Sequence, residues 1–308
     1  MGERVKDMTK GRPARLIVGF ALPLMLGNMF QQLYTMVDAI VVGQGVGVEA
    51  LAALGSADWP NWLVTGLVIG FTQGFSIRIS QRFGAEDYQG LRKTAAMSIL
   101  LTAAVAVVFT ILSLSLSRPV LILLDTPANV FDNALLYLRI IFAGIPIILG
   151  YNVLSAFLRA LGDSRTPLVA MIIAACINTA LDLLFVMVFH WGVAGAAIAT
   201  VFAQFCSCVF CFFAVRRISF FRMEKSDWQL DWRNIWDLIK LGSPTAFQNG
   251  VIGVGGLAVQ YVINGYGFLF VAGFTATNKL YGLLEIAASS FGYSMTTYVG
   301  QNQGAKRT

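Results

Sequence analysis

Four polar side chains recur at helical spacing inside an apolar stretch near the start of the chain: Asn28, Gln31, Thr35 and Asp38. The separations of three, four and three residues place all four on one face of a helix. An ionisable group inside a membrane segment is costly, so such a face is expected to line a bundle interior or an aqueous cavity. These residues are therefore candidates for binding a polar or charged ligand.

Two later apolar segments each carry a polar pair at i, i+4 spacing. Asn178 and Asp182 form the first pair, and Thr200 and Gln204 form the second. Counting from the helix ends at about 1.5 Å per residue places Asp38, Asp182 and Thr200 in the same half of the membrane. The sequence thus predicts an oxygen-rich site at Asp38, Asn178, Asp182 and Thr200 that could take H⁺ or Na⁺.

A carboxylate in apolar surroundings binds a proton more readily than one in water. Protonation of such a site changes which conformation is preferred, and that is a means of coupling an ion to transport. The structural alternative is that Asp38 and Asp182 cap or bridge helices, or lie in water at the outer interface. Gln204, Asn28, Gln31 and Thr35 are expected to line a cavity, together with Gln248 and Asn249 of a later helix.

Composition indicates that lipid surrounds most of the elements that hold these residues. The chain has 308 residues, of which 57% are hydrophobic and 12% are charged, against roughly 25% charged in soluble domains. A soluble fold of this size has too little polar surface here to face water. The net charge of +6 is spread over short basic clusters between apolar stretches, an arrangement that orients membrane proteins and does not favour nucleic-acid binding.

Eight apolar stretches are long enough to cross a bilayer, which needs about 20 residues. They are residues 16–42, 52–80, 94–117, 131–158, 167–189, 193–215, 236–263 and 269–299. Almost all of the Lys and Arg residues lie in the two tails and in alternate connections, and the opposite connections hold only Arg118. The positive-inside rule therefore predicts an all-α, multi-pass protein of the plasma membrane with a cytoplasmic N-terminus and an even number of crossings.

The polar stretch near residues 216–235 divides the chain. Residues 1–215 are expected to form a six-helix lobe, residues 216–235 a cytoplasmic linker, and residues 236–308 the first two helices of a second, repeated lobe. The sequence Gln-x-x-Gly-Ala supports the repeat, because it occurs at 81–85 and again at 301–305. Two complete lobes would need twelve helices, so the chain is expected to be a fragment of a longer transporter.

Several motifs, in order along the chain, resemble the multidrug and toxic compound extrusion (MATE) family. They are Leu22-Pro23 through Asp38-Ala-Ile-Val-Val-Gly43, Gln81-Arg-Phe-Gly-Ala85, Arg159-Ala-Leu-Gly-Asp-Ser-Arg-Thr-Pro167, Asn178-x-x-x-Asp182 and Gly192-Val-Ala-Gly through Thr200. The resemblance implies a V-shaped exporter of two six-helix lobes that exchanges H⁺ or Na⁺ for small organic cations. It implies that Asp38 is the coupling carboxylate, with Asn178, Asp182 and Thr200 as its neighbours.

No cofactor, ATP or obligate protein partner is expected for such an exporter. Some members of the family use a further carboxylate in the seventh helix. In this chain the only carboxylate there is Asp237, at the cytoplasmic start, so a second cation site of that kind is not expected.

Three other functions would make different demands on the sequence. A flippase for lipid-linked oligosaccharides or precursors of the same superfamily would need basic residues for pyrophosphate, whereas the first lobe offers Asp38 and Asp182 against Arg139 alone. A membrane enzyme is not expected, because the sequence shows no Walker motif, no plausible Ser/His/Asp set and no His and carboxylate cluster for a metal. A channel would pass current without saturable exchange.

Overall fold

The computed structural model describes residues 5–307, and of residues 283 and 284 only the backbone. Within that range the chain is helical and contains no strand. The α-helices are α1 Pro13–Gly45, α2 Val48–Gly84, α3 Tyr88–Leu123, α4 Ala128–Ala143, α5 Ile145–Ala160, α6 Arg165–Asp182, α7 Gly192–Arg216, α8 Trp232–Asn264 and α9 Phe268–Gly304. A π-helix, η1, covers Leu183–Val188, and two 3₁₀ turns, η2 and η3, cover Ser219–Phe221 and Lys225–Trp228.

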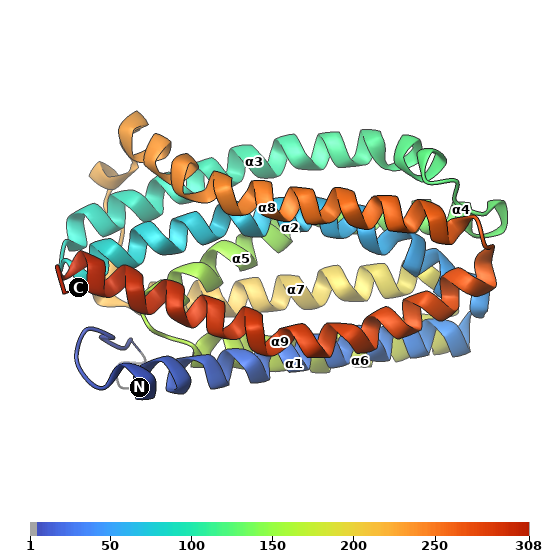
Figure 1. Ribbon diagram of the computed structural model, residues 1–308, viewed down its shortest axis with the longest axis horizontal. Coiled ribbons are helices and arrows are strands. Elements are labelled where there is room, and N and C mark those ends of the chain that lie inside the picture. Colours follow the sequence, from blue (N-terminus) through green and yellow to red (C-terminus); the bar gives the residue numbers. More distant parts are fainter. Residues whose placement is uncertain (1–4, 308) are drawn as a thin grey trace.

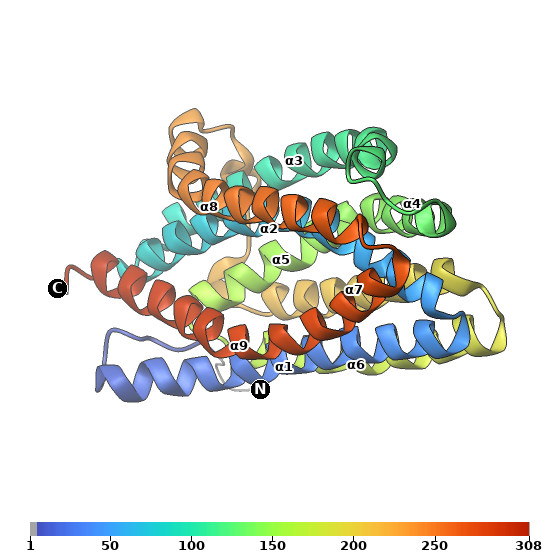
Figure 2. The same ribbon diagram turned by 45° about the vertical axis from the view of Figure 1, so that its right-hand side comes forward.

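The long helices run side by side along one axis, and the first and last described residues lie at the same end of the bundle (Figure 1). Figure 2 shows α1 beside α6, and α8 beside α2, from a second direction. An even number of crossings places both ends together in this way. The protein is thus a multi-pass bundle, as the apolar pattern predicts.

Six described helices are long and apolar enough to cross a membrane, and α4 with α5 makes a seventh crossing if the bent pair is one span. The continuous span predicted over 131–158 is therefore wrong in detail. The pair bends by 50° at Gly144, and Pro146 follows in the first turn of α5. Proline has no N–H to bond the preceding turn, so the first helix ends and a second begins. α9, the eighth predicted span, packs against α1 and α2 and is not among the six.

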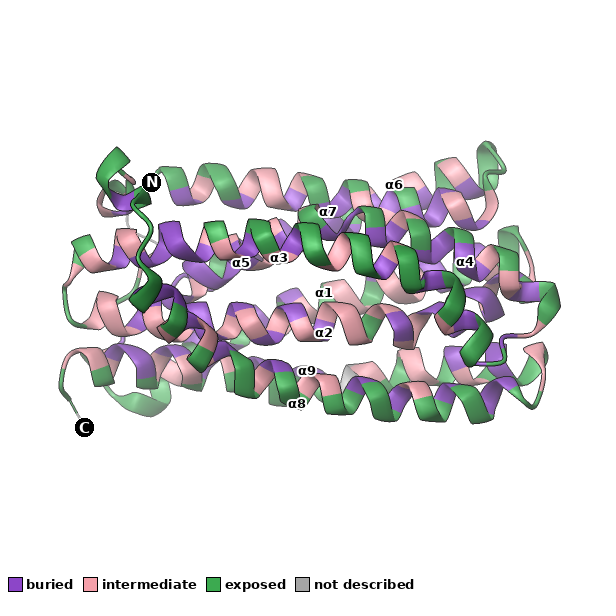
Figure 3. Cartoon of the chain, turned by 90° about the horizontal axis from the view of Figure 1, so that it is seen from above, coloured by how far each residue is buried: buried purple, intermediate pink, exposed green. Residues whose placement is uncertain are grey.

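The outer surface of the bundle is apolar. On α3, five large aliphatic side chains are each at least 50% exposed: Val107, Val108, Ile111, Leu112 and Leu116. Figure 3 shows buried residues along the inner faces of the helices and exposed ones outside. Exposing such a stripe to water costs about 25 cal/mol per Å² of apolar surface. Contact with lipid tails avoids that cost.

Glycines bring α2 and α8 into backbone contact along the bundle. A Cβ atom on Gly70 would overlap the backbone of Ala246, and one on Gly74 would overlap the backbone of Gly242. Gly66, Gly70 and Gly74 stand four residues apart and so form one stripe of α2. Small residues at this spacing let membrane helices approach closely enough for dispersion contacts between backbones.

The repeated Gln-x-x-Gly-Ala motifs meet each other where α2 and α9 end. A Cβ on Gly84 would overlap the carbonyl of Gln301, and a Cβ on Gly304 would overlap the carbonyl of Gln81. The two helices end at these glycines, so the contact is reciprocal. The division into lobes at 216–235 stays a prediction.

The end of α9 is hydrogen-bonded to two other segments. They are the residues before α1 and the turn between α5 and α6. The Gln301 side chain accepts a hydrogen bond from the Met8 amide at 2.8 Å and donates one to the Ala160 carbonyl at 2.9 Å. Within the turn, one Asp163 oxygen accepts the amides of Arg165 and Thr166 at 3.0 and 2.9 Å. The carboxylate thus satisfies N–H groups that the start of α6 leaves open.

The start of α8 differs from the prediction. The span was expected from residue 236, but the helix begins at Trp232, because the Asp231 side chain accepts the Asn234 amide at 3.1 Å and caps it. An aspartate at this position satisfies one of the unpaired amides in the first turn.

Candidate functional site

Asp38 lies on the inner face of α1 and is 6% exposed. Its Oδ1 atom is buried and accepts no hydrogen bond from any described residue. α1 packs against α6 and α9 at this side of the bundle. The sequence placed Asp38 on a face turned away from lipid, and its burial confirms that placement.

Asn178 and Asp182 lie on α6, and both are fully buried. Asp182 is the last residue of α6, and the chain continues without a break as the π-helix η1. π-helical turns widen the backbone and occur frequently at functional sites. Both carboxylate oxygens of Asp182 and the amide oxygen of Asn178 have no hydrogen-bond donor among the described residues. Asp182 also interacts electrostatically with Asp38 across the α1–α6 contact.

α7 completes the set. The Asn178 amide donates a long hydrogen bond of 3.4 Å to the Thr200 hydroxyl. The Gln204 amide donates to the Tyr34 hydroxyl of α1 at 3.3 Å, and the Gln204 side-chain oxygen accepts no hydrogen bond from the residues that the structure describes. These contacts place Asn178 beside Thr200, and Gln204 beside Tyr34. In the sequence, a tyrosine within an apolar helix looks like an ordinary packing residue. Only the structure shows that its hydroxyl has a polar partner on another helix.

Within the described part of the chain, acceptor atoms from three helices are therefore buried here without hydrogen-bond donors. Leaving a buried acceptor unpaired costs about 1–3 kcal/mol, and more for a charged group. A proton on a carboxylate would supply a donor, and a hard cation would bind such oxygens directly. Either one would offset the cost, so this oxygen set has the chemistry of a site for H⁺ or Na⁺.

The other predicted cavity residues have different surroundings. Asn28 donates to the Ser290 hydroxyl of α9 at 3.1 Å, and Asn249 donates to the Gly66 carbonyl of α2 at 2.8 Å. Both side chains therefore connect helices. The Thr35 hydroxyl donates to the Gln32 carbonyl of its own helix at 2.8 Å. Gln31 is half-buried, and Gln248 is exposed on α8.

An ion pair that the sequence did not predict joins α9 to α2. The Lys279 ammonium lies 3.0 Å from Asp58 Oδ2 and 3.1 Å from Asp58 Oδ1. Lys279 also interacts electrostatically with Asp38. Asp58 falls inside the predicted span 52–80. A carboxylate at membrane depth is the one feature of the sequence that could have pointed to this ion pair. Arg139 and Glu285, two further charged residues within the predicted spans, are exposed.

The fold and the motifs agree with a known family. The sequence profile of the MatE family matches residues 23–184, more than half of the chain. The chain belongs to the MatE family. The resemblance of its motifs to MATE exporters is thus confirmed.

A MatE relative from Bacillus subtilis (strain 168), named "Probable multidrug resistance protein YpnP", is 33% identical over 303 residues, which are 97% of this chain and 67% of that protein. A solved multidrug resistance MATE family transporter of the MOP superfamily, in an outward-facing conformation, has a TM-score of 0.86 at 26% identity and covers 98% of this chain and 68% of that one.

Another similar structure is a MOP superfamily transporter from Pyrococcus furiosus, with a TM-score of 0.87 at 26% identity over 98% of this chain and 67% of that one. Its description says that the reverse polarity of its binding pocket suggests a different function. The chain spans about two thirds of the length of these relatives.

Proposed function

We propose that this MatE chain carries the cation-coupling site of a secondary active exporter that exchanges H⁺ or Na⁺ for small organic cations across the cell membrane. The observation that carries the proposal is the buried set of unpaired oxygens on Asp38, Asn178 and Asp182, with Thr200 beside them. Asp38 is the coupling carboxylate in this proposal.

Coupling requires that the ion bind one conformation more tightly than another. The acceptors come from α1, α6 and α7, so an ion bound among them holds these helices at one mutual distance. α1 has Pro23 in its interior, which leaves the Gly19 carbonyl without its intrahelical donor and weakens the helix against bending. Loading or emptying the site would then shift α1 between two packings against α6.

The charges of the interior favour a cationic cargo over the pyrophosphate lipids of a flippase. Asp38, Asp58 and Asp182 contribute three carboxyl groups, and Lys279 is already paired with Asp58. A cation entering between the helices therefore meets an excess of acceptors. Efflux of this kind needs no ATP or cofactor, because the ion gradient supplies the free energy, and we propose neither.

The orientation proposed for the exporter has both described ends of the chain in the cytoplasm. Both lie at one end of the bundle (Figure 1), and that end carries Arg78, Arg82 and Lys240 at the ends of α2 and α8. The excess of Lys and Arg at one membrane face marks the cytoplasmic side.

The test is efflux of ethidium from proteoliposomes, with a proton gradient and a Na⁺ gradient imposed separately. It compares the chain, a version extended to the length of its MatE relatives, and the extended version carrying Asp38→Asn. Glu285→Gln, an exposed carboxylate of α9, is the matched control.

Gradient-driven efflux that Asp38→Asn abolishes and Glu285→Gln retains would support the exporter and its site together. A folded, extended protein that moves no cation under either gradient would overturn the exporter and favour the flippase. Efflux that persists in the Asp38→Asn variant would show that a group other than Asp38 couples the ion to transport.

A further inference from the structure

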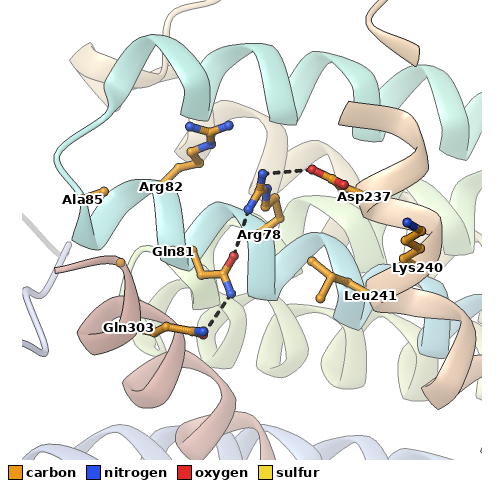
Figure 4. A pocket seen from close by; sticks show the side chains of 9 residues that line it. Arg78, Gln81, Arg82, Ala85, Asp237, Lys240, Leu241 and Gln303 are labelled. Atoms are coloured by element: carbon orange, nitrogen blue, oxygen red, sulfur yellow. Dashed lines mark hydrogen bonds and ion pairs between the residues drawn. The ribbon is translucent and has the colours of Figure 1, made fainter. Parts of the chain in front are cut away.

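A basic cavity lies at the end of the bundle that holds the two chain ends, between α2, α8 and α9 (Figure 4). Its volume is about 520 Å³, within the range of small-molecule sites. Its lining carries three cationic side chains, Arg78, Arg82 and Lys240, one carboxylate, Asp237, and the amides of Gln81 and Gln303. None of these groups belongs to the oxygen set at Asp38.

The cations retain binding capacity beyond their internal partners. Arg78 donates to Asp237 at 3.0 Å and to Gln81 at 3.3 Å, which uses two of the N–H groups on a guanidinium that carries about five. Arg82 pairs with Asp87 at 2.6 Å. Lys240 forms no ion pair with a described residue, and its ammonium lies 5.7 Å from the ring of Trp236. Three ammonium or guanidinium groups around one cavity favour an anion, and a guanidinium fork matches phosphate oxygens in particular.

Aromatic residues place this cavity at the depth of lipid headgroups. Trp232 and Trp236, in the first turns of α8, are 72% and 57% exposed. Tryptophan collects at the membrane interface, where its ring meets the acyl chains and its N–H meets water. Trp236 directly precedes Asp237, and its ring lies 5.7 Å from the Lys240 ammonium, so the ring lies beside two residues that line the cavity.

We propose that the cavity binds a phosphate group, carried by the headgroup of an anionic lipid of the facing leaflet. Basic pockets between helices on the cytoplasmic side are suited to such headgroups. The volume is larger than a phosphate ion requires and leaves room for the glycerol part of a headgroup. The lining comes from α2 on one side and from α8 and α9 on the other, so a bound headgroup holds these helix ends together.

The experiment measures lipid bound to the purified chain by native mass spectrometry, with phosphatidylglycerol and phosphatidylcholine added in parallel. Inorganic phosphate and glycerol phosphate form two further arms, each read by the thermal unfolding of the chain in a zwitterionic detergent. The variants are Lys240→Gln, which removes a cation without breaking an ion pair, and Asp237→Asn, which removes the carboxylate. Lys225→Gln, an exposed basic residue of the linker, is the control for general surface charge.

We expect phosphatidylglycerol to bind and phosphatidylcholine not to bind. Lys240→Gln should weaken binding by about fivefold, the weight of one basic residue at an anionic surface. Asp237→Asn should strengthen it, a direction that a folding defect cannot produce, and Lys225→Gln should leave it unchanged. Stabilisation by glycerol phosphate or inorganic phosphate that depends on Lys240 would support the phosphate site and assign it to a soluble anion.

Equal weakening by Lys240→Gln and Lys225→Gln would overturn the proposal, because binding would then follow the overall charge of that face. Equal binding of the two lipids would overturn it as well. None of these measurements depends on transport, so failure of the exporter leaves the result unaffected.

Discussion

The Lys279 ammonium lies 3.0 Å from the Asp58 carboxylate and ties α9 to α2. Both side chains are largely buried, at 21% and 28% exposed. The Gln32 amide of α1 donates to the carbonyl of the same lysine. Residue 279 is thus a point at which three helices meet, and an ion pair there links two regions that the sequence assigns to different lobes.

Breaking this pair should destabilise the protein. Asp58→Asn and Lys279→Gln each leave one buried charge unpaired, and we expect each to lower the free energy of unfolding by about 1.5–3 kcal/mol. The double variant should lose less than the sum of the two. A thermal-unfolding double-mutant cycle in detergent measures the coupling, expected at about 0.5–3 kcal/mol. Additive single effects would show that the two groups do not interact.

Asp38→Asn should make the chain more stable while it removes coupling. The carboxylate is buried with an unpaired oxygen, and a neutral amide costs less to bury than a charge. Thermal unfolding at neutral pH checks this against Glu285→Gln, which should change little. The gain should shrink as the pH is lowered, because the wild-type carboxyl then becomes neutral as well. A loss of stability would mean that Asp38 has a structural partner.

Gly70→Ala should destabilise the contact between α2 and α8. The added methyl would overlap the Ala246 backbone, and overpacking of this kind costs about 1–3 kcal/mol. Gly255→Ala on α8 is the matched control, because its Cβ meets nothing within 4 Å. That control should raise stability by up to about 1 kcal/mol, since alanine favours helix over glycine. Unfolding curves of the two variants should therefore move in opposite directions.

Asp163→Ala should loosen the start of α6. The substitution removes the acceptor of the Arg165 and Thr166 amides, and loss of such a cap costs about 0.5–2 kcal/mol. Hydrogen exchange should accelerate at these two amides. Asp132→Ala, at an exposed position of α4, should leave that exchange unchanged. Equal protection in the Asp163 variant would contradict the capping role.

The membrane helices and the oxygen set could be predicted because both contrast with their surroundings in the sequence. Apolar runs of sufficient length indicate spans, and a carboxylate or amide inside one of them stands out, as Asp38, Asn178 and Asp182 do. The bend before α5 also had a local signal, since Gly144 and Pro146 stand two residues apart within the predicted span.

Partners across the bundle could not be predicted in the same way. Asp58 and Lys279 are 221 residues apart in the chain, and one sequence carries no distance between them. Tyr34 looks like a packing residue in the sequence. Its contact with Gln204 arises only when α1 and α7 meet. The fit of Gly70 to Ala246 likewise depends on the register of two helices.

The reciprocal contact of Gly84 and Gly304 fixes the distance between α2 and α9 at their shared end. α2 and α9 each have 37 residues and are about 55 Å long, and they touch backbone to backbone at one end. A tilt of about 10° around that point would move Asp58 and Lys279, about 38 Å along the two helices, apart by about 7 Å and would break their ion pair, so the two contacts together set the angle between α2 and α9. A bulky residue at either position would push the ends of these two helices apart.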